Sequence, residues 1–176
     1  MAESIPTLAS LDMQPYLVDG ALPSDLDGKV GIYAIFDQAQ TLQYVGFSRN
    51  VNVGLLQHLV RCPEQCHWVK VYTVERPSRT LLDDIRQGWL AENGAVPAGN
   101  SDAQLAWEKP IDAKTFMTEA ERQEIADADP TDVNKLLKQV ARRVEVEVKA
   151  KVEARGAQMP IKFNPKLKEQ GILALK

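Results

Sequence analysis

Residues 31–50 read GIYAIFDQAQTLQYVGFSRN and contain the two segments that decide the fold. The segments 29–36 (KVGIYAIF) and 42–47 (LQYVGF) are rich in β-branched and aromatic residues, which favour strands. The polar run DQAQT between them has the length of a hairpin loop. The stretch therefore predicts two antiparallel strands, which carry Tyr33 and Tyr44. Packing alone explains an aromatic pair on a hairpin, so the tyrosines by themselves do not predict catalysis.

Helical and extended patterns alternate after this hairpin. The apolar spacing over 50–61 predicts a helix with Ser48 as its N-cap, and 67–75 (HWVKVYTVE) predicts a third strand. Pro77 and Ser78 open a second helix, which Gly94 closes. The order β-β-α-β-α predicts an α+β domain over 28–102, with a three-stranded antiparallel sheet flanked by helices. An irregular lead-in precedes it over 1–27.

Residues 103–176 predict a helical, basic C-terminal extension. Thr118 and Glu121 have capping-box spacing, and a long helix is expected from Asp129 to a C-cap at Gly156. Within that helix, 143–153 (RVEVEVKAKVE) alternates like a strand. It also contains glutamate–lysine pairs at helical spacing, and no breaker precedes it. We therefore expect a helix there, with a strand as the alternative, and an extended tail over 159–176.

Charge is distributed unevenly along the chain. The net charge is −3, but residues 1–134 hold 10 basic against 20 acidic residues, whereas 135–176 hold 11 against 4. Any attraction to phosphate therefore belongs to the C-terminal segment, where Arg142 and Arg143 are candidate nucleic-acid contacts. A solvated helix face is the other interpretation of this basic run. No apolar run reaches the length of a membrane span and no signal peptide is visible, which predicts a cytoplasmic protein without a membrane partner.

The triplets GIY (31–33) and YVG (44–46), their spacing and the element order resemble the GIY-YIG nuclease family. Within that family, the runs YVGFSRN, CPEQC and VPAGN resemble the N-terminal domain of plant chloroplast monothiol glutaredoxins. The resemblance implies metal-dependent phosphodiester hydrolysis of nucleic acid, DNA more than RNA, with Mg²⁺ or Mn²⁺ as the cofactor. It also implies catalytic roles for Tyr33, Tyr44 and His58, and a nucleic-acid contact for Asn100. A packing histidine and a turn asparagine are the alternatives for the last two.

Two residues that this family's chemistry requires are replaced. The arginine expected ten residues after Tyr44 is Gly54, and the metal-binding glutamate expected three residues before Trp89 is Arg86. Possible substitutes are Arg49 for the arginine and, for the metal ligand, Asp83, Asp84 and Glu75. The sequence therefore predicts an endonuclease-like domain with weak or lost activity. The alternative is a non-catalytic adaptor that binds nucleic acid or protein.

Cys62 and Cys66 are the two cysteines of the chain. They stand four residues apart and are followed by His67, which gives at most three zinc ligands without a second pair. Two ordinary thiols are therefore expected. The resemblance leaves open a redox response through Cys66, which matches a cysteine of the plant domain.

Overall fold

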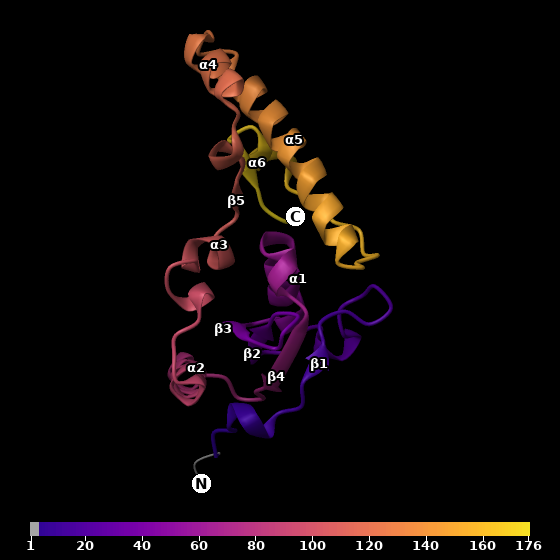
Figure 1. Ribbon diagram of the computed structural model, residues 1–176, viewed down its shortest axis with the longest axis vertical. Helices are drawn as coiled ribbons and strands as arrows, with labels where there is room; N and C mark the ends of the chain where they lie inside the picture. Colours follow the sequence, from indigo (N-terminus) through magenta and orange to yellow (C-terminus); the bar gives the residue numbers. More distant parts are fainter. Residues whose placement is uncertain (1–3) are drawn as a thin grey trace.

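An antiparallel four-stranded sheet forms the centre of the structure, a computed structural model that describes residues 4–176 (Figure 1). The predicted α+β class and the β-β-α-β-α order are confirmed. The strands lie in the order β1-β4-β2-β3, with bounds Gln14–Pro15, Trp68–Thr73, Gly31–Phe36 and Leu42–Ser48. The sequence did not predict β1, which lies in the lead-in and extends the three expected strands by pairing with β4.

The central strand β2 separates two hydrophobic clusters because successive side chains of a strand point to opposite faces. Ile32, Ala34 and Phe36 belong to the cluster that includes residues of α2 (Arg79–Asn93). Tyr33 and Ile35 belong to the other cluster, which includes residues of α1 (Val51–Arg61). Both signature tyrosines therefore lie on the α1 side of the sheet.

The caps of these two helices follow the sequence with one correction. Ser78 caps α2, and Gly94 ends it with a φ of 81°, as predicted. For α1 the prediction of Ser48 was wrong: the side chain of Asn50 accepts hydrogen bonds from the N–H groups of Asn52 and Val53. Ser48 is still part of β3, whereas a capping side chain must stand directly before the first helical residue.

The C-terminal extension is mostly helical, as expected. The capping box of Thr118 and Glu121 is present, and 143–153 lies within one long helix, so the helical prediction for that stretch is confirmed. The helices and strands of this segment are α3 (Gln104–Glu108), β5 (Ile111–Asp112), α4 (Glu119–Asp127), α5 (Val133–Ala154), α6 (Pro165–Lys168) and β6 (Ile172–Leu173). Short 3₁₀ turns complete the chain at Leu8–Ser10, Ser24–Leu26, Pro63–Gln65, Ala98–Asn100 and Ala113–Phe116.

The prediction of an extended tail holds in part: residues 172–173 form the strand β6, but the helix α6 over Pro165–Lys168 was not predicted. Asn164 caps α6, where Pro165 takes the first helical position that proline favours. Beyond it, β6 pairs antiparallel with β5 and places Leu173 in the core. The pairing of β6 with β5 holds the tail in place. No local sequence pattern predicts this pairing, because β5 lies about 60 residues earlier in the chain.

The extension packs against the α1 side of the sheet. Val144 and Val152 of α5 lie in the same hydrophobic cluster as Leu55 and Leu59 of α1. Arg155 Nε also donates a 3.1 Å hydrogen bond to the backbone carbonyl of Cys66. The core therefore crosses the predicted boundary between residues 102 and 103, and that boundary stays a prediction. No helix within residues 4–176 has the length and apolarity to cross a membrane.

Candidate functional site

Tyr33 and Tyr44 lie side by side on neighbouring strands. Their ring centroids are 6.4 Å apart. Gly46 stands opposite Tyr33 in the strand register, and the ring of Tyr44 folds over it. A Cβ atom at Gly46 would come within 2.5 Å of a ring carbon of Tyr44. The glycine of the second triplet thus makes room for the tyrosine of the same triplet.

His58 completes this group, which we call the tyrosine cluster (Tyr33, Tyr44 and His58). The hydroxyl of Tyr33 and Nε2 of His58 share a 2.8 Å hydrogen bond, and the imidazole lies 4.6 Å from the ring of Tyr44. Burial, and then the charge of Arg61, lowers the pKa of His58 to about 3. The imidazole is therefore neutral near pH 7. Its Nδ1 atom has no hydrogen-bond partner among residues 4–176.

The two tyrosine hydroxyls stay protonated. Tyr33 is 3% exposed and Tyr44 is 5% exposed. Burial raises the pKa of Tyr33 well above its usual value, and the neighbouring Tyr44 raises it further. Burial also raises the pKa of Tyr44, with a second contribution from the carboxylate of Glu108. A phenol with a raised pKa is a poor general base near neutral pH.

Helix α3 covers the tyrosine cluster. The indole of Trp107 stacks on Tyr44 with 5.2 Å between ring centroids and 7° between planes. The hydroxyl of Tyr44 donates to Glu108 Oε1 at 3.1 Å. Arg61 Nη1 donates to the Trp107 carbonyl at 3.0 Å and so ties the end of α1 to α3. The hydroxyl and ring face of Tyr44 are therefore already occupied by the protein itself.

Three residues of the site were not predicted from the sequence: Arg61, Trp107 and Glu108. Arg61 could have been found, because it follows His58 by three residues and Gly54 by seven, which places all three on one helix face. Trp107 and Glu108 follow the loop after α2, and no spacing relates them to Tyr44. Only the folded chain brings them to the site.

Gly54 and Arg86 occupy the positions where the family arginine and glutamate were expected. A Cβ atom at Gly54 would lie 2.9 Å from the hydroxyl oxygen of Tyr33, so a larger side chain requires Tyr33 to move. Arg86 forms an ion pair with Asp83 and lies over the ring of Phe47 at 5.2 Å. The guanidinium of Arg86 thus places positive charge where the family requires a metal-binding carboxylate.

The candidate metal ligands do not form a cation site. Asp83 is paired with Arg86, and the side chains of Asp84 and Glu75 are exposed. No group of three histidine, cysteine, aspartate or glutamate side chains within the described part of the chain could hold a metal ion. These residues do not fit the octahedral oxygen shell that Mg²⁺ prefers. Dependence on Mg²⁺ or Mn²⁺ stays a prediction.

Arg49 stands between β3 and α1 with an exposed side chain. Within residues 4–176 it forms no ion pair and no side-chain hydrogen bond, and the structure does not join it to the tyrosine cluster. Its catalytic role stays a prediction.

Asn100 has a structural position at the edge of the sheet. Its Oδ1 accepts a hydrogen bond from the Val45 N–H, and its Nδ2 donates to the Val45 carbonyl, both at 2.8 Å. The amide thus imitates a neighbouring strand along the open edge of β3. A role in nucleic-acid binding stays a prediction.

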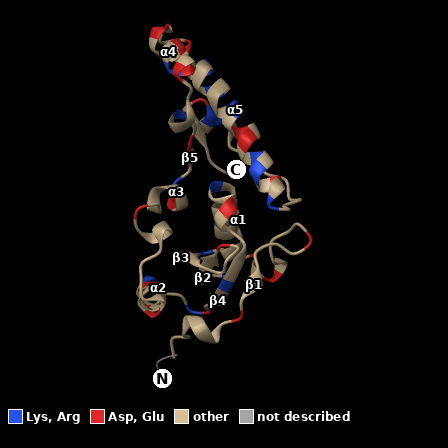
Figure 2. Ribbon diagram, in the orientation of Figure 1, with Lys and Arg blue, Asp and Glu red and all other residues tan. Residues whose placement is uncertain are grey.

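The two arginines predicted to contact nucleic acid differ in their environment. Arg143 forms ion pairs with Glu121 at 2.7 Å and Glu147 at 2.9 Å, and it donates to the Phe116 carbonyl. Arg142, by contrast, is exposed. Basic and acidic residues alternate along α5 (Figure 2). The basic segment is therefore a mixed surface with many internal ion pairs.

Both cysteines are free thiols. Cys66 is 0% exposed, and burial raises the pKa of its thiol far above the usual value. Burial raises the pKa of Cys62 to about 11. Redox chemistry proceeds through the thiolate, which these environments disfavour. The redox response through Cys66 stays a prediction.

The chain is similar to part of a plant protein. No protein-family model matches the chain. A bifunctional monothiol glutaredoxin-S16 from Arabidopsis thaliana, described as chloroplastic, is 31% identical over 118 residues. The match covers 65% of this chain and 39% of the relative, so the chain spans well under half of that protein. The chain is therefore related to one part of a plant monothiol glutaredoxin.

Proposed function

We propose that the chain is a GIY-YIG-type endonuclease-like domain in which phosphodiester hydrolysis is weak or lost, and that it binds nucleic acid, DNA more than RNA. One observation carries the proposal. Tyr33 and Tyr44 on neighbouring strands lie together with His58 of α1, but Trp107 and Glu108 close over them. Ancestry and loss of activity rest on different features of this site.

The ancestry is supported by local geometry. Both triplets lie on paired strands, and Gly46 provides the space that the ring of Tyr44 needs. His58 on α1 shares a hydrogen bond with Tyr33 and stands at the position that the resemblance assigns to the histidine.

The loss of activity is supported by charge and access. Gly54 supplies no charged donor, and the loss of one such donor typically costs ~10²–10³ in rate. Arg86 is unsuited to hold a cation, and its partner Asp83 is already engaged. The buried phenols of Tyr33 and Tyr44 keep their protons, so neither is poised to activate water.

Nicking of supercoiled plasmid in Mg²⁺ or Mn²⁺ tests the catalytic half. We expect wild type and Tyr33→Phe to nick at the same background rate. An Arg86→Glu variant, which restores the family carboxylate, should gain metal-dependent nicking if the ancestry is correct. Arg79→Glu makes the same charge change on an exposed residue of α2 and serves as the control. Robust wild-type nicking that Tyr33→Phe abolishes would refute weak or lost activity.

Fluorescence anisotropy with matched DNA and RNA duplexes tests the binding half. Phosphate contacts predict a linear fall of log affinity with log salt, with a slope near −0.9 per neutralised phosphate for duplex DNA. We expect tighter binding to DNA, with a slope that decreases in Arg142→Met. An absence of binding at low salt would reject the nucleic-acid partner.

A protein-binding adaptor is the second candidate, and the surface of the extension favours it. Lys149 and Lys168 both pair with Glu145, and Lys138 pairs with Glu169, which leaves less positive charge for phosphate. The relative is named a bifunctional monothiol glutaredoxin, and the word bifunctional indicates a second activity in that protein. The description chloroplastic applies to the relative. That this chain is cytoplasmic stays a prediction. A protein partner would bind with little dependence on salt.

A further inference from the structure

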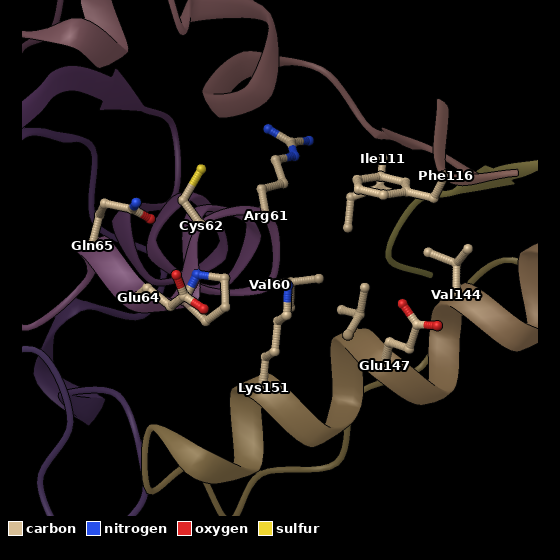
Figure 3. A pocket seen from close by; sticks show the side chains of 12 residues that line it. Val60, Arg61, Cys62, Glu64, Gln65, Ile111, Phe116, Val144, Glu147 and Lys151 are labelled. Carbon is tan, nitrogen blue, oxygen red and sulfur yellow. The ribbon is translucent and has the colours of Figure 1, made fainter. Parts of the chain in front are cut away.

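Two surface hollows lie on either side of Arg61, away from the tyrosine hydroxyls. The first, of about 310 Å³, lies between the end of α1 and α5, and Figure 3 shows the side chains that line it. The second, of about 500 Å³, lies between α3 and the segment around β5. Arg61, Ile111 and Phe116 line both hollows. Arg61 is thus the basic side chain that the two hollows share, whereas Lys151 lines the first alone and Lys109 the second alone.

The second hollow has the composition of a small-molecule site. Its apolar walls come from Leu105, Ala106, Pro110, Ile111 and Phe116, and its size falls within the usual range for ligand pockets. Leu105 is 74% exposed and Phe116 is 55% exposed, although both are large apolar side chains. An apolar ligand lying between them would remove this surface from water.

Arg61 is a partly buried cation without an ion pair. Its guanidinium donates one hydrogen bond, to the Trp107 carbonyl, and within residues 4–176 no carboxylate pairs with it. Two of the acids that line the hollows are engaged elsewhere, Asp112 with Lys114 and Glu147 with Arg143. The third, Glu64 of the first hollow, is exposed and forms no ion pair with Arg61. A partly desolvated charge without a counter-ion is unfavourable, and the planar guanidinium is suited to a carboxylate.

We propose that the second hollow binds a small amphipathic carboxylate, with its head group on Arg61 and its apolar body against Leu105, Ile111 and Phe116. The charge and the apolar walls are both required for this assignment. Arg61 alone would suit any anion, and the walls alone would suit any apolar molecule. The site does not use the tyrosine cluster, so it stands whether or not the chain acts on nucleic acid.

Octanoate and the neutral alcohol 1-octanol are the probes, measured by calorimetric titration of the full chain. We expect octanoate to bind and 1-octanol to bind much more weakly. Arg61→Met should weaken octanoate binding by about tenfold or more, the typical loss of one charge-assisted hydrogen bond. Arg142→Met removes an exposed arginine on α5 and should leave octanoate binding unchanged. Equal binding of the two probes, or an unchanged affinity in Arg61→Met, would overturn the proposal.

Leu105 provides a test that does not depend on the contacts of Arg61 within the fold. Its side chain is mostly exposed, so a charged residue there leaves the core intact. Both Leu105→Glu and Leu105→Lys remove part of the apolar wall, but Leu105→Glu should weaken octanoate binding more, because only the glutamate also repels the carboxylate. Equal weakening by both variants would contradict the assigned head-group position. Inorganic phosphate should not displace octanoate; displacement at equal concentration would mean a general anion site and would also overturn the proposal.

Discussion

Replacing Trp107 with alanine tests whether α3 stabilises the closed tyrosine cluster. The indole is 3% exposed and stacks on Tyr44 at 5.2 Å. Truncation of a buried tryptophan to alanine costs about 3–5 kcal/mol of unfolding free energy. An aromatic stack contributes ~0.5–1.5 kcal/mol beyond its buried area. We therefore expect a loss of about 3–5 kcal/mol, a large part of the ~5–15 kcal/mol that stabilises a typical domain.

Urea unfolding followed by circular dichroism measures this loss. For a chain of this size, 1 kcal/mol corresponds to about 2–4 °C, so the melting temperature should fall by roughly 6–20 °C. Leu105→Ala on the same helix is the matched control, because Leu105 is 74% exposed and its truncation should change stability by less than ~0.5 kcal/mol. A double-mutant cycle with Tyr44→Leu should give a coupling of ~0.5–1.5 kcal/mol for the stack.

Alkaline absorbance titration gives a second readout. Burial is the largest cause of the raised pKa of Tyr44, and Trp107 supplies part of that burial. In Trp107→Ala one tyrosine should therefore ionise nearer the usual pKa of ~10. A loss of less than ~1 kcal/mol together with an unchanged tyrosine titration would refute the view that α3 closes the site.

Three further predictions concern single side chains. As the pH falls from about 6.5 to about 3, His58 should lower the stability by up to ~1.36 kcal/mol per pH unit, because with a pKa of about 3 in the folded chain it gains its proton only on unfolding. Urea midpoints should show a flatter dependence in His58→Gln. Arg143→Met should lower the free energy of unfolding by ~1–2 kcal/mol because its ion pairs are lost, whereas Arg142→Met should change it by less than ~0.5 kcal/mol. Equal shifts of the melting temperature in the two variants would contradict this difference. Asn100→Ala should cost ~1–3 kcal/mol and speed hydrogen exchange at the Val45 amide; unchanged exchange would exclude the edge-capping role.

Local patterns predicted most of the fold. The hairpin of β2 and β3 follows from β-branched and aromatic residues on both sides of a polar loop, and Ser78, Gly94 and the capping box mark the ends of their helices. The missed elements include the short helices α3 and α6 and the strands β1, β5 and β6, each two residues long. Such strands exist only because a partner lies alongside, and those partners are distant in the sequence: β4 for β1, and β5 for β6.

The candidate site was predicted in part. The resemblance supplied Tyr33, Tyr44 and His58, and the structure brings all three together. It could not supply Trp107 and Glu108, because a stacking partner 63 residues beyond Tyr44 leaves no periodic signal. The sequence also could not predict that Arg143 is paired whereas Arg142 is exposed, because the partners of Arg143 lie on another helix and on the next turn of α5.

Leu173 belongs to the hydrophobic cluster on the α1 side of the sheet, and this affects how the chain folds during synthesis. The sheet residues of that cluster are complete once Val71 has been made, but Leu173 follows 102 residues later. At a synthesis rate of ~5–20 residues per second, about 5–20 s pass between the synthesis of Val71 and that of Leu173. During that interval the nascent chain presents an incomplete apolar surface to chaperones and to other nascent chains. The α2 side, whose cluster ends at Leu90, is complete much earlier, so the two faces of one sheet differ in how long they are vulnerable to aggregation.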